Sequence, residues 1–166
     1  MSTADRAIAA VVLAAGKGTR MKSQRHKVLH EIGGKPMIDH LLGEVDKLGT
    51  QRTVVVVGEW REQVEKHLGT RASFAVQDQQ LGTGHAVMQA KDALAGFDGD
   101  VLLMFGDVPF VRAQTMSAML DRLHAEDAPA VVVLGFEPED ALQYGRVIAQ
   151  DGRIAKMVEF KDASEE

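Results

Sequence analysis

The chain has 166 residues, of which 45% are hydrophobic, so it can bury the core of one folded domain. Its formal net charge of -5 argues against general nucleic-acid binding, which needs a broad basic surface, and the absence of cysteine excludes disulfides and thiolate metal sites. The first ten residues do not resemble a signal peptide, and no apolar run approaches the roughly 20 residues of a membrane span. We therefore expect a cytoplasmic protein without a membrane partner.

The first half of the chain alternates predicted strands and helices. Residues 7–15 (AIAAVVLAA) form an unbroken apolar run, which is typical of a strand buried on both faces. Apolar residues then recur at helical spacing from Pro36, which suits a first helical position, to Gly49, which suits the stop. A second buried strand is predicted at residues 53–58, followed by a helix with a polar face at residues 59–69.

The second half continues this alternation. Its pattern predicts a strand at residues 73–77, a helix at 85–94, a strand at 100–107, a helix at 115–124 and a strand at 130–136. Repeated strand–helix units imply an α/β fold whose mainly parallel sheet is covered by helices on both faces. Ligands of such sheets bind beyond the carboxyl ends of the strands.

The pattern changes near the end of the chain. Residues 144–160 form two alternating runs around Asp151-Gly152, which strongly indicates a hairpin. This hairpin would be a late antiparallel addition to the Rossmann-like parallel sheet.

A basic, glycine-containing stretch follows the first predicted strand. Gly16 and Gly18 would let backbone N–H groups approach an anion, Thr19 adds a hydroxyl, and Arg20 and Lys27 add positive charge. The spacing satisfies neither the dinucleotide-binding fingerprint nor the P-loop pattern. A triphosphate site and a merely flexible, solvated basic loop therefore both remain open on these residues alone.

Three later places could complete such a site. Asp107 follows an apolar strand, where a carboxylate can hold Mg²⁺ against phosphates or serve as a turn residue. In residues 77–86, amide side chains that can pair with a base edge precede Gly82 and Thr83, which could equally form an ordinary helix cap. Glu159, late in the hairpin, could accept hydrogen bonds from sugar hydroxyls or be only solvated.

Several motifs occur in a characteristic order: LAAGKGTRM, KVLH, GKPM, QDQQLGTGHA, GDVP, YGR and VEFKDA. Together they resemble the N-terminal uridyltransferase domain of the bifunctional N-acetylglucosamine-1-phosphate uridyltransferase/glucosamine-1-phosphate acetyltransferase family. The first motif is shared by sugar-nucleotide pyrophosphorylases in general, whereas QLGTGHA and VEFKDA are specific to the N-acetylglucosamine branch. The resemblance runs from about Ile8 to Asp162 and implies a fold of the nucleotide-diphospho-sugar transferase type.

The resemblance also implies an activity. Uridylyl would pass from UTP to N-acetylglucosamine 1-phosphate, giving pyrophosphate and UDP-N-acetylglucosamine, a precursor for peptidoglycan and cell-wall synthesis, with Mg²⁺ as cofactor. The alternatives are a sugar-1-phosphate nucleotidyltransferase of other specificity and a non-catalytic nucleotide-sugar-binding module. A homo-oligomer is expected, a trimer if the full-length protein carries the family's left-handed β-helix domain.

The family's functional residues can be carried over position by position. They are Arg20 and Lys27 for catalysis at the phosphates; Leu13, Ala14, Ala15, Gly16, Gly18, Thr19, Gln77, Gly82, Thr83, Phe105, Gly106, Gly145 and Glu159 for substrate binding; and Asp107 for the metal. Within the substrate-binding group, Gln77, Gly82 and Thr83 fall on uracil recognition, whereas Gly145 and Glu159 fall on amino-sugar contacts.

The sequence departs from the family pattern at three points. The family usually has proline where this chain has His26, which puts the stiffness of the loop before Lys27 in doubt. It often has tyrosine where this chain has Phe105, so a hydroxyl near the sugar is lost. Finally, the family domain continues beyond the position of Glu166 with two asparagines that contact the sugar and the metal. We therefore expect residues 1–166 to be a nucleotidyltransferase domain that is incomplete at its C-terminus and feeble in catalysis.

Overall fold

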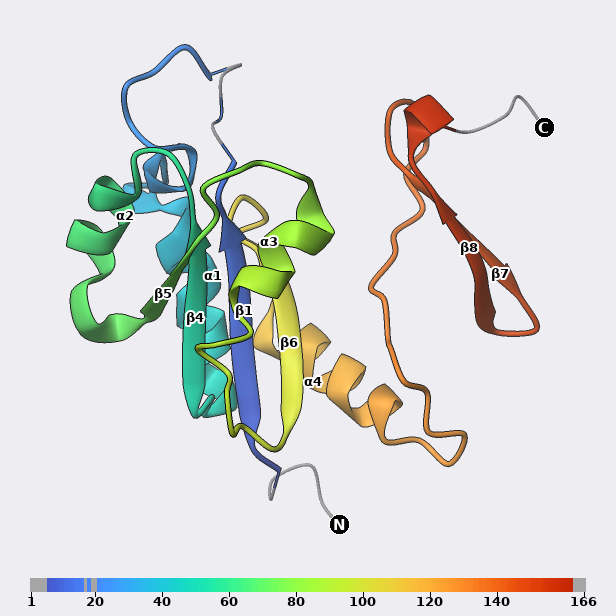
Figure 1. Cartoon of the computed structure of the whole chain (residues 1–166). Coiled ribbons are helices and arrows are strands. Elements are labelled where there is room, and N and C mark those ends of the chain that lie inside the picture. The colour runs from blue at the N-terminus through green and yellow to red at the C-terminus, as the bar shows by residue number, and fades with distance from the viewer. Residues whose placement is uncertain (1–5, 17, 19–20, 163–166) are drawn as a thin grey trace. The chain divides into compact units, whose positions relative to one another are not determined.

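The computed structural model describes residues 6–16, 18 and 21–162 of the chain. The chain divides into two compact units, residues 1–130 and 131–166, and each is described by itself. Figure 1 shows the strands and helices of both units. Among the described residues, no helix is long and apolar enough to cross a membrane.

A four-stranded parallel sheet forms the centre of the first unit (Figure 1). Its strands are β1 (Ile8–Ala14), β4 (Arg52–Val57), β5 (Ser73–Val76) and β6 (Asp100–Phe105), in the order β5-β4-β1-β6. β1 lies inside the sheet and is almost wholly buried, as its unbroken apolar run predicts. The predicted α/β fold with a mainly parallel sheet is thus confirmed.

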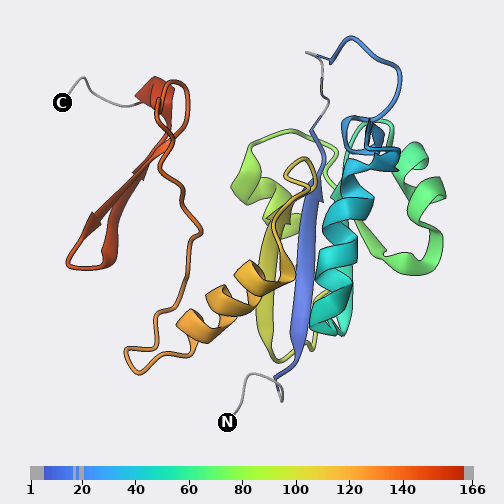
Figure 2. The same ribbon diagram turned by 180° about the vertical axis from the view of Figure 1, so that it is seen from behind.

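Helices cover both faces of this sheet. Buried side chains of α1 (Met37–Val45), α2 (Arg61–Leu68) and α4 (Ala113–Leu123) share one apolar cluster, whereas α3 (Thr83–Gln89) belongs to the cluster on the opposite face. The view from behind in Figure 2 shows α1 and α4 in front of the strands. Short connecting elements are η3 (Lys27–Leu29), β2 (Glu31–Ile32), β3 (Lys35–Pro36), η4 (Asp46–Leu48) and η5 (Gly69–Arg71).

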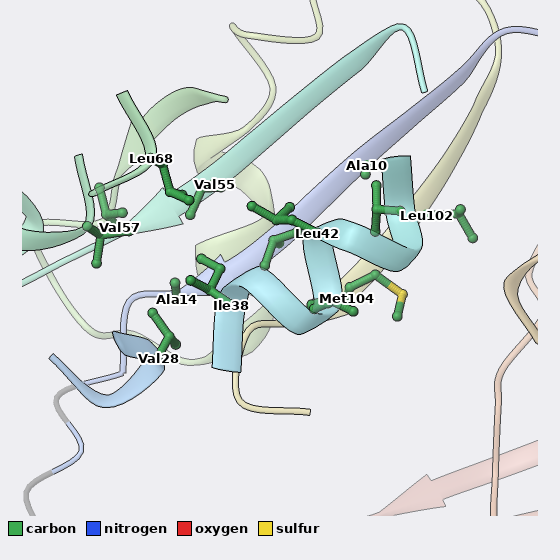
Figure 3. Close-up of a cluster of buried hydrophobic side chains, with 14 of the residues drawn as sticks. Ala10, Ala14, Val28, Ile38, Leu42, Val55, Val57, Leu68, Leu102 and Met104 are labelled. Atoms are coloured by element: carbon green, nitrogen blue, oxygen red, sulfur yellow. The ribbon is translucent and has the colours of Figure 1, made fainter. Parts of the chain in front are cut away.

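The largest buried cluster forms where α1 packs against the sheet (Figure 3). Ile38, Leu41, Leu42 and Val45 are all fully buried, and their i, i+3, i+4, i+7 spacing places them on one face of the helix. Pro36 is the residue before this helix rather than its first turn. This packing holds the central strands, and with them the loops at their carboxyl ends.

The second unit contains the predicted hairpin. β7 (Arg146–Gln150) pairs with β8 (Arg153–Val158) in antiparallel register, and η6 (Phe160–Asp162) follows. Both turn residues have positive φ, 50° at Asp151 and 74° at Gly152, as a tight hairpin turn requires.

The predicted strand at residues 130–136 is wrong. This segment has no regular secondary structure, and its side chains of Val131 and Phe136 are 69% and 66% exposed. Its β-branched composition favours an extended chain, but a strand also needs a neighbour that accepts and donates its backbone hydrogen bonds. No strand in the described part of the chain pairs with it. The predicted helix at residues 85–94 also starts earlier and is shorter, because residues 90–96 form turns instead.

We predict that Leu42→Ala lowers the free energy of unfolding by about 2–5 kcal/mol, because it leaves a cavity under the sheet. Chemical denaturation followed by circular dichroism measures this loss. Leu134→Ala makes the same chemical change at a half-exposed position and should alter stability by less than about 0.5 kcal/mol. Equal losses in the two variants would contradict the described core.

Candidate nucleotide-binding site

A cavity of about 670 Å³ opens beyond the carboxyl ends of β1, β5 and β6. It is built from the loop after β1, the start of η3, the segment between β5 and α3, and the turn after β6. Its lining residues are Leu13, Ala14, Ala15, Gly16, Gly18, Met21, Lys27, Val28, Gln77, Gln80, Gly82, Thr83, Ala86, Phe105 and Asp107. This is where ligands of parallel α/β sheets bind.

The charged centre of the cavity is an ion pair between Lys27 and Asp107. The distance between Lys27 Nζ and Asp107 Oδ2 is 2.5 Å, and the two side chains are 32% and 35% exposed. Val28 and Leu29, which follow Lys27, are buried in the main apolar cluster and hold η3 in place. The fold thus brings a cation and a carboxylate 80 residues apart in sequence to one point.

Two glycines permit the close approach of backbone segments at this point. Gly18 has a φ of +58°, and a Cβ there would lie 2.8 Å from the Cβ of Lys27. A Cβ on Gly106 would lie 3.1 Å from Val28 Cγ1 and 3.2 Å from the Leu13 carbonyl oxygen. Both positions therefore need the smallest residue for steric reasons, and Gly18 also needs it for its backbone conformation.

On the opposite wall, the amide of Gln77 is held in one orientation. Its side chain is buried, and Nε2 donates to the Gly82 carbonyl at 3.1 Å and contacts His85 Nδ1 at 3.0 Å. An amide nitrogen is only a donor, so His85 Nδ1 accepts. Oε1 of Gln77 has no hydrogen bond to any described residue and is the acceptor left for a ligand. Nearby, Gln80 Nε2 donates to the Ala15 carbonyl at 2.7 Å and ties this segment to β1.

His26 lies buried directly before Lys27. Its side chain is 1% exposed, its Nδ1 accepts a long hydrogen bond from the Val28 N–H, and its Nε2 has no partner among the described residues. Burial lowers the pKa of His26 from its ordinary value of 6.5, and the nearby Ala14 backbone opposes this only in part. The imidazole is therefore neutral at pH 7.

Most of the residues assigned from sequence line this one cavity. The exceptions fall into three groups. Gly106 lies beside it and donates its N–H to the Leu13 carbonyl at 2.9 Å. Thr19 and Arg20 lie outside the described residues. Gly145 and Glu159 belong to the second unit, where a Cβ on Gly145 would lie 3.9 Å from Glu159 Oε2.

Sequence reasoning missed four lining residues: Met21, Val28, Gln80 and Ala86. All four lie inside motifs that the sequence analysis quoted, so proximity to those motifs was the available signal. No group of three or more metal-ligating side chains occurs in the part of the chain that the structure describes. Asp107 is thus not part of such a group among the described residues.

We predict that the buried His26 makes the protein less stable as the pH falls below about 6.5. In the unfolded chain His26 is protonated as the pH falls below its ordinary pKa, whereas in the folded chain the lowered pKa keeps it neutral. The free energy of unfolding therefore rises with pH across this window. Unfolding free energies at pH 7.5 and pH 5.5 should differ less in His26→Gln than in the parent chain. An identical pH dependence in both would show that His26 is not the responsible group.

Comparisons with known proteins identify relatives of this chain. It is 66% identical over 161 residues to the bifunctional protein GlmU of Novosphingobium aromaticivorans, a match that covers 97% of this chain and 36% of that protein. The chain thus spans little more than a third of the length of this relative.

Two solved structures share the fold. HddC from Yersinia pseudotuberculosis has a TM-score of 0.70 at 22% identity, covering 91% of this chain and 68% of that one. Rv0371c from Mycobacterium tuberculosis, solved as a complex with manganese, has a TM-score of 0.58 at 21% identity, covering 69% and 58%.

The profile of one family, described as the MobA-like NTP transferase domain, matches residues 10–150. This range includes every described residue that lines the cavity. The chain therefore belongs to the family of MobA-like NTP transferase domains.

Proposed function

We propose that this chain binds UTP with a divalent cation, Mg²⁺, and transfers uridylyl to N-acetylglucosamine 1-phosphate, releasing pyrophosphate. The observation that carries the proposal is the Lys27–Asp107 pair at the glycine-containing end of β1, inside the one cavity that gathers the nucleotide-site residues. The 66% identity to the bifunctional protein GlmU of Novosphingobium aromaticivorans, a protein of greater length, supports this proposal.

The chemistry of the site suits a triphosphate. Backbone N–H groups around Gly16 and Gly18 can approach phosphate oxygens closely, and the Lys27 ammonium adds positive charge beside them. Asp107 offers the hard carboxylate oxygen that Mg²⁺ prefers. A divalent cation held by this carboxylate would neutralise negative charge on the phosphates. Lys27 would then be free to pair with a phosphate oxygen instead of Asp107.

The transfer needs positioning more than covalent chemistry. An oxygen of the sugar phosphate attacks the α-phosphorus in line, and a new P–O bond forms. The bond from the α-phosphorus to the bridging oxygen breaks at the same time, so the electron pair leaves with pyrophosphate. Lys27 stabilises the charge that develops on the phosphates, and Arg20 is proposed to do the same. No covalent enzyme intermediate is required.

Gln77 explains a preference for uracil. Because its Nε2 is held by Gly82 and His85, it presents Oε1 as an acceptor for the N3–H of uracil. Cytosine carries no proton at N3. Its N3 lone pair would face Gln77 Oε1, and two acceptors cannot form a hydrogen bond. Ala14 and Ala15 line the same cavity, and we propose that a purine, which is larger than a pyrimidine, does not fit beside them when its edge faces Gln77.

For the sugar, we propose contacts from Gly145 and Glu159. Gly145 directly precedes β7 and Glu159 directly follows β8, and the Glu159 carboxylate can accept hydrogen bonds from sugar hydroxyls. Phe105 lines the nucleotide cavity with an apolar ring. Cytoplasmic cell-wall precursor synthesis and assembly of the complete protein as a trimer remain part of the proposal.

The proposed metal site predicts that Asp107→Asn removes most Mg²⁺-dependent turnover, because an amide is a far weaker ligand for a hard cation. The measurement is pyrophosphate release from UTP and N-acetylglucosamine 1-phosphate during a Mg²⁺ titration of the complete protein. Asp121→Asn, an exposed change on α4 outside the cavity, is the matched control. An unchanged Mg²⁺ titration in Asp107→Asn rejects the site, and UTP binding without any turnover in the parent favours the non-catalytic module.

The orientation of Gln77 predicts that UTP binds about tenfold or more tightly than CTP, because CTP leaves two acceptors facing each other. GTP should bind more weakly still. Calorimetric titration of each nucleotide in the presence of Mg²⁺ gives the three dissociation constants. Equal binding of CTP and UTP would overturn the assignment of Gln77, and tight binding of GTP would overturn the proposed exclusion of purines.

A further inference from the structure

One glutamine outside the cavity holds the chain segment that leads into Lys27. Gln63 lies on α2, and its Oε1 accepts the backbone N–H of His26 at 2.8 Å. Its Nε2 donates to the backbone carbonyl of Gln24 at 2.9 Å. The single amide therefore satisfies one donor and one acceptor of the same loop. We call this pair of hydrogen bonds the Gln63 bridge.

The Gln63 bridge acts on the residue directly before the proposed catalytic lysine. His26 caps η3, and Lys27 is the first residue of that element. On its other side, Lys27 lies so close to Gly18 that a Cβ on Gly18 would come within 2.8 Å of the Lys27 Cβ. A shift of the loop before His26 would therefore move the Lys27 side chain relative to both the glycine-containing loop and Asp107.

The backbone of His26 shows what the Gln63 bridge replaces. Its φ of -55° and ψ of 138° are values that proline also adopts. Proline would hold this conformation through its ring and would have no N–H. The chain has His26 instead, whose N–H is in a buried residue and needs an acceptor.

We propose that Gln63 is a positioning residue for the transfer reaction: its bridge to Gln24 and His26 holds Lys27 at the phosphates. This inference rests on the proposed function, because it assigns a purpose to the placement of Lys27. Gln63 is not among the described residues that line the cavity, so its proposed effect on the reaction is through the loop alone.

A double-mutant cycle tests the coupling between the two residues. Gln63→Leu removes the acceptor and leaves the His26 N–H unpaired. His26→Pro replaces that N–H with a ring carbon directed at Gln63 Oε1, which lies only 2.8 Å from the nitrogen and would clash with it. Each single variant should raise the dissociation constant and the KM for UTP about tenfold. The double variant His26→Pro/Gln63→Leu has neither the donor nor the acceptor and should return to within about twofold of the parent.

The readouts are calorimetric binding of UTP with Mg²⁺, the KM and kcat of the complete protein, and the melting temperature. Gln51→Leu, at an exposed position outside the cavity, is the control and should leave all of them unchanged. Recovery of UTP affinity in the double variant supports the inference. Unchanged affinity in Gln63→Leu, or losses that simply add in the double variant, would overturn it. A parent protein that does not bind UTP at all would instead reject the proposed function, and this role with it.

Discussion

The parallel pairing of β1 with β6 is the constraint on which the site depends. In this register Leu13 lies opposite Phe105, and the Gly106 N–H donates to the Leu13 carbonyl. The chain segments that follow β1 and β6 therefore begin side by side at the same edge of the sheet. The segment after β1 leads to Lys27, and the segment after β6 leads to Asp107. Burial on β6 holds this register, because a one-residue slip would turn buried side chains such as Met104 to the exposed face of that strand.

The ion pair formed at this edge is suited to exchange. Both side chains are about one-third exposed, and ion pairs of this kind contribute roughly 0–1 kcal/mol to stability. Breaking the pair therefore costs little when better partners arrive. A divalent cation is a stronger partner for the Asp107 carboxylate, and a triphosphate is a stronger partner for the Lys27 ammonium. The resting contact keeps both groups at the place where the proposed reaction needs them.

The parts of the structure that sequence could predict are those with a local signal. The apolar run before Gly16 predicts the buried central strand, and the helical spacing of Ile38, Leu42 and Val45 predicts α1. The strand expected at residues 130–136 fails because pairing depends on a neighbour, which the run itself does not contain.

Contacts between distant residues explain what sequence reasoning missed at the site. The two hydrogen bonds of the Gln63 bridge join residues 37 and 39 positions apart, and the Lys27–Asp107 contact joins residues 80 apart. Neither leaves a periodic pattern. The resemblance placed Lys27 and Asp107 in one site, but no motif pointed to Gln63. The buried orientation of the Gln77 amide likewise depends on His85, and the sequence shows only that amides are present.

The central claim is that Lys27 and Asp107 exchange their mutual contact for phosphate and metal. A crystal structure of the protein with Mg²⁺ and a non-hydrolysable UTP analogue tests it most directly. The account predicts a metal ion about 2.0–2.1 Å from an Asp107 carboxylate oxygen, Lys27 Nζ on a phosphate oxygen, and the uracil N3–H on Gln77 Oε1. An analogue bound elsewhere, or bound in the cavity with the Lys27–Asp107 pair intact and no metal on Asp107, would contradict it.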